Sequence, residues 1–175
     1  GFIGMFSTYD SLQWTRRVYY ESARFGDVFA GLRRAPRSLE RDIAAIPGVA
    51  EAEATVVFDV TLDLPGVEEP LTGRMIGLVD GAQPRLNRLT LRRGRFIEPG
   101  DPREVLVSEG FATARGLGPG DRLAAILNGA REDLQIVGVV LSPEYVFATQ
   151  GGSLPDDRGF GIFWIDRDRL ASAFD

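Results

Sequence analysis

The sequence contains no cysteine and no histidine, and all of its 20 basic residues are arginine, so lysine is absent as well. Without cysteine the chain can form neither a disulfide framework nor a thiolate metal site, and cysteine usage gives no information about the compartment. Without histidine it lacks the commonest general base and metal ligand, which excludes Ser-His hydrolytic triads and zinc-hydroxide chemistry. The absence of lysine excludes a P-loop, a Schiff base and a Ser-Lys dyad. We therefore expect no catalytic residue, no cofactor and no tightly bound metal.

Long apolar runs and an excess of positive charge are missing too. The net charge of -5 argues against a surface that follows nucleic-acid phosphates. No segment reaches the roughly 18 apolar residues that indicate a membrane span. The length of 175 residues and the hydrophobic fraction of 44% are typical of a globular protein with one core or two small subdomains.

The first residues, GFIGMF, combine glycine with large apolar side chains, and the chain does not open with methionine. This start is compatible with the end of a severed transmembrane helix and equally with a loosely packed terminus. In the first case the membrane-proximal residues are Phe2, Ile3, Met5 and Phe6. The parent gene would then encode apolar runs of about 20 residues on both sides of this segment.

The first half of the chain predicts a strand, a helix and a second strand. Residues 27–32 are compatible with a short buried strand, and residues 38–46 with a helix that has three apolar side chains on one face. Residues 56–64 alternate between apolar and polar positions, which indicates a half-buried strand. Because a helix connects the two strands, we expect a parallel β-α-β unit. A further strand is expected over residues 71–79.

Residues 92–148 carry the most informative pattern. A β-rich run at 105–107 leads into a helix that Ser108 is expected to cap and Gly116 to end. A tight turn follows at residues 118–121, where proline presets its own φ and the next glycine can take a positive φ. The segment therefore predicts strand, short helix, turn and then further strands.

The last third predicts a hairpin, a strand and a helix. Residues 123–127 and 134–141 flank Asn128-Gly129, the dipeptide best suited to a two-residue hairpin turn. Residues 162–165 form a short apolar strand, and Asp166 is expected to cap the final helix.

Two surface features could bind a partner, and each has a structural alternative. Arg92, Arg93 and Arg95 form a basic cluster that could contact lipid headgroups or a protein, but charged strand edges also discourage unwanted pairing, and we favour that explanation. Tyr145 and Phe147 lie in a proline-containing segment after the hairpin. They could anchor a partner or cover the end of a core, and the sequence leaves both interpretations open.

Two further patterns are interpreted as structural. The glycines at 116, 118 and 120 follow a helix and open a strand, whereas a phosphate-binding loop follows a strand and opens a helix. The acids Asp156 and Asp157 lack the spaced oxygen ligands of a calcium loop, and Asp166 is explained as a helix cap. Neither pattern predicts a ligand site.

Five segments, in this order, carry a family resemblance: RFGDVFAGLRRAP, the predicted helix with the IPGV that follows it, LRRGRF, PGDPREVLVSEGFATARGLGPGD and LQIVGVVLSPEYVFA. They resemble the extracytoplasmic core domain of ABC transporter permeases of the MacB/FtsX type, from about Tyr19 to Phe174. The resemblance implies an α+β fold with a mixed α/β porter-like part and a β-rich sabre-like part. The implied division is a membrane-proximal helix at 1–25, a porter-like β-α-β part at 26–75, a sabre-like part at 76–165 and a returning helix at 166–175.

The resemblance also implies a function. Such domains are non-catalytic and either transmit ATP-driven conformational change or handle a hydrophobic, lipid-like or peptide cargo on the periplasmic side of the inner membrane. The implied partners are the membrane, a cytoplasmic ATP-binding cassette subunit, a second permease subunit and a periplasmic protein, with no nucleic acid. The alternatives are a free-standing periplasmic ligand-binding or protein-interaction module, and a hydrolase that pairs Asp59 or Asp63 with another acid in a cleft, although both acids are expected on the solvent-facing side of their strand.

One packing problem follows from the predicted β-α-β unit. The strand over 56–64 presents five apolar side chains on one face, and the helix over 38–46 is short for covering them. In the family a second half of the porter part would share that work. We therefore expect self-association or an unusual local packing to bury this face.

Overall fold

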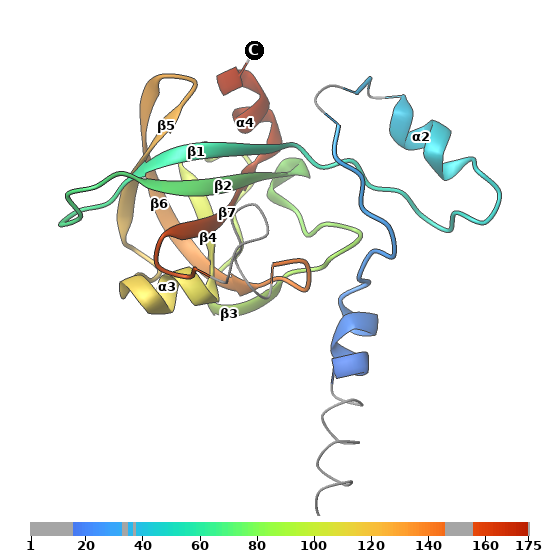
Figure 1. Ribbon diagram of the computed structural model, residues 1–175, viewed down its shortest axis with the longest axis horizontal. Helices are drawn as coiled ribbons and strands as arrows, with labels where there is room; N and C mark the ends of the chain where they lie inside the picture. The colour runs from blue at the N-terminus through green and yellow to red at the C-terminus, as the bar shows by residue number, and fades with distance from the viewer. Residues whose placement is uncertain (1–15, 33–34, 37, 146–155, 175) are drawn as a thin grey trace, which may run out of the picture.

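The computed structural model describes residues 16–32, 35–36, 38–145 and 156–174 (Figure 1). It is an α+β protein, as predicted. The helical residues 16–22 come first. The elements that follow are α2 (Leu39–Ala44), β1 (Val57–Asp63), β2 (Leu71–Leu78), the 3-10 turn η1 (Val79–Gly81), β3 (Thr90–Gly94), β4 (Glu104–Ser108), α3 (Glu109–Arg115), β5 (Arg122–Leu127), β6 (Ala130–Leu141), β7 (Phe160–Asp166) and α4 (Arg167–Phe174).

The strands form one sheet that closes on itself. Their order is β3-β6-β4-β7-β2-β1-β5, and β5 pairs again with β6. Closure is possible because β6 is long: its first half, Ala130 to Gln135, pairs with β5, and its second half, Gly138 to Leu141, pairs with β3. Six strands therefore enclose a barrel, and β3 extends it beside the second half of β6.

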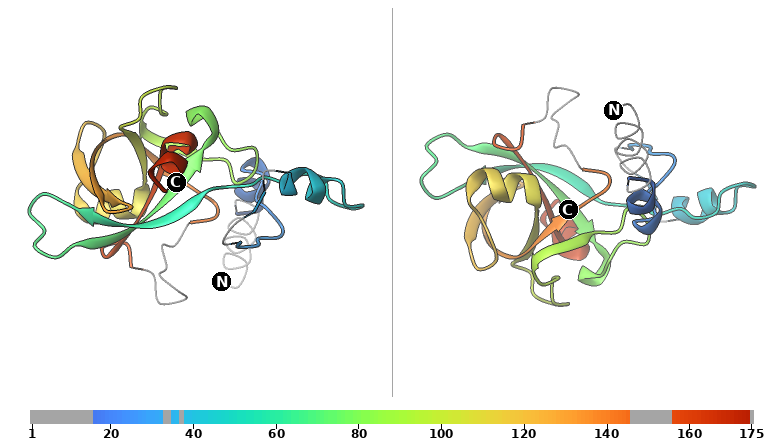
Figure 2. Two further views of the ribbon diagram at one scale, coloured as in Figure 1. Left: turned by 90° about the horizontal axis from the view of Figure 1, so that it is seen from above. Right: turned by 90° about the horizontal axis from the view of Figure 1, so that it is seen from below.

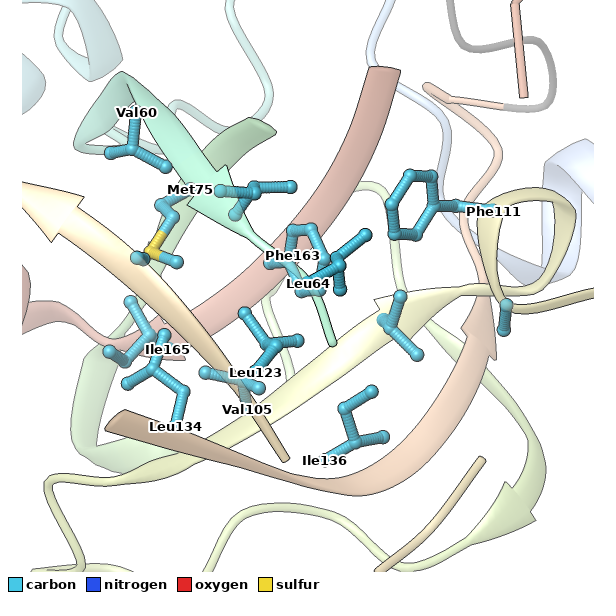
Figure 3. Packing of buried hydrophobic residues seen from close by; sticks show 14 of the residues in the cluster. Val60, Leu64, Met75, Val105, Phe111, Leu123, Leu134, Ile136, Phe163 and Ile165 are labelled. Atoms are coloured by element: carbon cyan, nitrogen blue, oxygen red, sulfur yellow. The ribbon is translucent and has the colours of Figure 1, made fainter. Parts of the chain in front are cut away.

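The barrel interior is a filled hydrophobic core (Figure 3). Side chains alternate between inside and outside along each strand, as the pleat requires. On β4, for example, Val105 and Val107 face the interior, whereas Leu106 belongs to a second cluster on the outer surface. Phe111 of α3 and Leu170 of α4 enter the interior cluster from two helices on opposite sides of the barrel (Figure 1).

Several local predictions are confirmed. The β5–β6 hairpin turns at Asn128 and Gly129, which have φ of 47° and 82°. Gly116 takes the left-handed conformation that ends α3, with φ of 67°. Asp166 accepts hydrogen bonds from the amides of residues 168 and 169 at 3.0 and 3.1 Å, so it caps α4. Ser108 differs from its prediction: its buried hydroxyl makes no hydrogen bond, so α3 begins without a side-chain cap.

The predicted parallel β-α-β unit is wrong. Residues 27–32 form no strand, and β1 pairs antiparallel with both β2 and β5. The helix α2 buries none of its residues and lies apart from the barrel (Figure 1). On the apolar side of β1, Val60 and Leu62 are buried inside the closed barrel, and Phe58 stacks on Phe174 of α4. Self-association of the chain stays a prediction.

The predicted boundary between residues 75 and 76 falls inside β2. The strands on both sides of it belong to the same sheet. The assignment of porter-like and sabre-like parts therefore stays a prediction, and the structure itself divides the described chain into a barrel and a preceding arm. We use arm for the described residues between 16 and 56, which extend from one side of the barrel (Figure 2).

Candidate interaction surfaces

The arginine cluster of β3 is largely paired with carboxylates. Arg92 donates from Nε to Oε1 of Glu109 on α3 at 3.0 Å. Arg95 binds the buried carboxylate of Glu104 through both terminal nitrogens, and the Nη1 to Oε2 distance is 2.8 Å. This pairing holds the pKa of Glu104 below its ordinary value. Arg93 donates to a backbone carbonyl in the turn after α3. The geometry favours the structural explanation of these arginines, and their contact with lipid or a partner stays a prediction.

Tyr145 covers part of the outer cluster. Its ring meets that of Trp164 edge to face, with the centroids 6.2 Å apart. The hydroxyl lies beside Glu144 and Arg74, and burial raises the pKa of this hydroxyl. Tyr145 therefore contributes to the core, which is one of its two predicted roles. The other residues predicted to contact a partner or the membrane, Phe147, Phe2, Ile3, Met5 and Phe6, lie outside the described residues.

The arm is attached to the barrel by a loop that the sequence did not single out. We call residues 83–89 the clasp. The amide of Arg85 donates to Oε1 of Glu53 on the arm at 2.9 Å, and the amide of Leu86 donates to Oε2 of the same carboxylate at 2.8 Å. One carboxylate thus satisfies two consecutive backbone amides, and hydrogen bonds to a charged acceptor are the stronger kind.

The next two amides of the clasp bind the other end of the arm. The amide of Asn87 donates to the carbonyl of Arg24 at 3.0 Å, and that of Arg88 donates to the carbonyl of Ala23 at 2.7 Å. In return, the amide of Gly26 donates to Oδ1 of Asn87 at 2.9 Å. Both Arg24 and Asn87 have φ of 52°, the left-handed region that costs most residues energy and that Asn tolerates best.

The clasp is itself fixed to the barrel. The side chain of Gln83 makes two hydrogen bonds to the backbone of Leu89, one to the carbonyl at 2.8 Å and one from the amide at 3.0 Å. Leu89 is buried in the outer cluster. Asn87 donates from Nδ2 to Oε2 of Glu144 at 3.1 Å, and burial raises the pKa of the Glu144 carboxyl.

Arg85 extends this attachment to α2. Its guanidinium donates to the carboxylate of Glu40 on α2 and to the carbonyl of Ala52. It also lies 3.6 Å from a carboxylate oxygen of Glu51, which pairs with Arg24. These ion pairs are partly exposed, so each is expected to contribute little to the free energy of unfolding. Their main effect is expected to be on the orientation of α2 relative to the clasp.

Two hollows of the described surface are small or shallow. A pocket of about 50 Å³ lies where the arm, the clasp and the barrel meet, between Glu53, Asn87 and Trp164. An open groove of about 350 Å³ lies between β1, the β5–β6 turn and Phe174. The described residues contain no group of three or more acids placed to hold a metal ion. None of their helices has both the length and the hydrophobicity needed to cross a membrane.

Exposed apolar side chains concentrate on the arm. Val28 is 87% exposed, Leu32 63% and Ile46 52%, and Phe25, Phe29 and Ile43 are also exposed. The described barrel surface exposes few large apolar residues by comparison. Large apolar side chains exposed in contiguous patches are typical of interaction sites, whereas singly scattered ones are common on any protein surface.

Comparison with known proteins gives a family. The family model described as the MacB-like periplasmic core domain matches residues 1–173. No curated protein matches the sequence. The solved structures that the chain resembles include the extracellular domain of the noncanonic ABC-type transporter YknZ from Gram-positive bacteria, with 17% identity and a TM-score of 0.48. Another is the periplasmic region of MacB from Actinobacillus actinomycetemcomitans, with 14% identity and a TM-score of 0.46. The matches cover 79% and 81% of this chain, and 65% and 59% of those two structures.

Proposed function

The chain belongs to the MacB-like periplasmic core domain family, and from that premise we propose that it is the extracytoplasmic domain of an ABC transporter permease that transmits conformational change and performs no catalysis. In this proposal the cytoplasmic ATP-binding cassette subunit acts on the domain through the membrane part of the full-length permease. The domain itself lies outside the inner membrane, facing the periplasm.

The observation that favours transmission over cargo storage is the filled barrel. Its interior is occupied by side chains from all six strands and from α3 and α4. A pocket that binds a drug-sized ligand is about 300–1,000 Å³ and buries most of that ligand. Of the hollows among the described residues, the pocket of about 50 Å³ is too small and the groove too open to enclose a hydrophobic or peptide cargo. A packed barrel with an arm extending from one side is better suited to transmitting movement than to enclosing cargo.

The exposed apolar residues of the arm support a protein partner. We propose that this surface contacts the second permease subunit or a periplasmic protein. The observation that favours protein over lipid is that apolar residues are exposed both in α2, at Ile43, and just after it, at Ile46, beside the acids Glu40 and Asp42. A mixed apolar and charged surface is typical of the core and rim of a protein interface.

The test uses the full-length permease with its ATP-binding subunit in nanodiscs. This chain has no cysteine of its own, so in a permease whose other cysteines have been replaced, spin labels can be placed at Glu21→Cys on the arm and Asp133→Cys on the exposed β5–β6 hairpin. We expect the distance between the labels to change between the nucleotide-free and ATP-bound states. A distance that stays constant through the ATPase cycle, together with saturable binding of a lipid or peptide to the isolated domain, would contradict transmission and favour cargo handling.

A free-standing periplasmic ligand-binding or protein-interaction module is the alternative. The parent reading frame separates the two, because a permease needs apolar runs of about 20 residues beside this segment. A frame without such runs would remove the permease proposal.

A further inference from the structure

We propose that the clasp, residues 83–89, is the joint between the arm and the barrel, and that Glu53 and Asn87 are the residues that hold it in position. This inference deepens the proposed function and rests on it for its meaning in the permease. The isolated chain is sufficient to test it.

The first argument is that four consecutive amides of the clasp all donate to the arm. Those of Arg85 and Leu86 share the Glu53 carboxylate, and those of Asn87 and Arg88 bind two arm carbonyls. Surface loops normally satisfy such amides with water or with their own turn. Four consecutive amides that point to one neighbouring segment fix the orientation of that segment by geometry.

The second argument is that the joint is polar. It consists of main-chain hydrogen bonds, the Glu53 carboxylate, the Asn87 side chain and the partly exposed ion pairs of Arg85, and it adjoins a pocket of about 50 Å³. The barrel, by contrast, is closed around a packed core, and packed cores resist continuous deformation. A change in arm orientation therefore requires rearrangement of a few hydrogen bonds and no repacking of the barrel.

The third argument is the central position of Asn87. Its backbone amide and Oδ1 bind the arm, while its Nδ2 binds Glu144 of the barrel. Its backbone has a positive φ and lies opposite Arg24, which has the same φ of 52°. Left-handed residues persist where the surroundings hold them, and they concentrate in elements that switch. Asn87 thus connects the arm, the clasp and the barrel in one residue.

The test compares Glu53→Ala and Asn87→Gly with the unchanged chain. Glycine at position 87 removes both side-chain hydrogen bonds but tolerates the positive φ, so the clasp backbone keeps its conformation. Glu68→Ala is the matched control, because it removes an exposed acid from the β1–β2 loop, on the opposite side of the barrel from the arm (Figure 1). Every variant also carries Glu21→Cys and Asp133→Cys with spin labels.

We expect a narrow distribution of label distances in the unchanged chain and in Glu68→Ala, and a broad distribution in both joint variants. Hydrogen exchange at amides 85–88 should become at least about tenfold faster in Glu53→Ala, while protection in β4, β6 and β7 stays unchanged. Joint variants with distributions as narrow as that of Glu68→Ala would overturn the proposal. Loss of barrel protection together with the arm would also overturn it, because the two parts would then be one cooperative unit.

The permease experiment gives a separate result. If label distances change during the ATPase cycle in the unchanged permease and this change is lost in Glu53→Ala, the joint transmits the movement. If the joint variants broaden the distances in the isolated chain but the permease shows no movement, the joint stands and the proposed function fails.

Discussion

The substitution Leu170→Ala tests whether α4 is part of the barrel core. Leu170 has no exposed surface and packs in the interior cluster, although it lies on the last helix of the chain. Truncation of a fully buried leucine to alanine removes transfer free energy and leaves a cavity, and typically lowers the free energy of unfolding by about 2–5 kcal/mol. In a domain of this size 1 kcal/mol corresponds to about 2–4 °C, so Tm should fall by about 4–20 °C.

The matched control is Ser172→Ala, two residues further along the same helix. Ser172 is exposed, and its hydroxyl donates to the carbonyl of Arg169 at 2.9 Å within the helix. Surface substitutions of this kind change stability by about 0.5 kcal/mol or less. Urea unfolding followed by circular dichroism measures both variants. Equal midpoints for Leu170→Ala and Ser172→Ala would show that α4 does not contribute to the core, and the barrel would then be complete without it.

The sequence predicted the elements whose signals are local. Asn128-Gly129 predicts its hairpin because a type I′ turn needs two adjacent residues with positive φ, and the structure has both. The alternation over 56–64 predicts β1 because one face of a strand meets a core wherever that core lies. Asp166 predicts its cap because the amides it binds are two and three residues away.

Closure of the barrel was not predictable in this way. It depends on pairing between Thr61 to Asp63 of β1 and Ala124 to Ile126 of β5, about sixty residues apart. No local pattern specifies that contact. A helix between two strands made parallel pairing the natural expectation, but α2 lies on the arm and β1 turns back antiparallel to β2.

The candidate surfaces show the same limit. Sequence reveals that Arg92 and Arg95 are close together, but not that Glu109 and Glu104 of other elements neutralise them. The clasp has no distinct sequence pattern, because its donors are backbone amides, which every residue except proline has. A weak signal did exist in Asn87, since Asn is the residue that most often accepts a positive φ after glycine.

Three further predictions concern the barrel. Gly138→Ala should lower the free energy of unfolding in urea by about 1–3 kcal/mol, because the new Cβ would lie 2.2 Å from the carbonyl oxygen of Arg95. The control Gly31→Ala should leave this free energy unchanged, because a Cβ there meets nothing within 4 Å. A double-mutant cycle of Phe58→Ala and Phe174→Ala should give a coupling free energy of about 0.5–1.5 kcal/mol, because the two rings stack with their centroids 3.8 Å apart. Additive effects of the two substitutions on the free energy of unfolding would show that the stack is not formed. The last prediction is that Glu104→Gln changes how the thermal stability of the chain depends on pH. Because Arg95 lowers the pKa of Glu104 in the folded state, ionised Glu104 stabilises the fold above its unfolded pKa of about 4.5, and this stabilisation is lost as the pH falls through the lowered value. The Tm of Glu104→Gln should therefore lie below that of the unchanged chain at pH 7, with the gap narrowing towards pH 3; a gap that stays constant with pH would show that the lost contribution is packing and not charge.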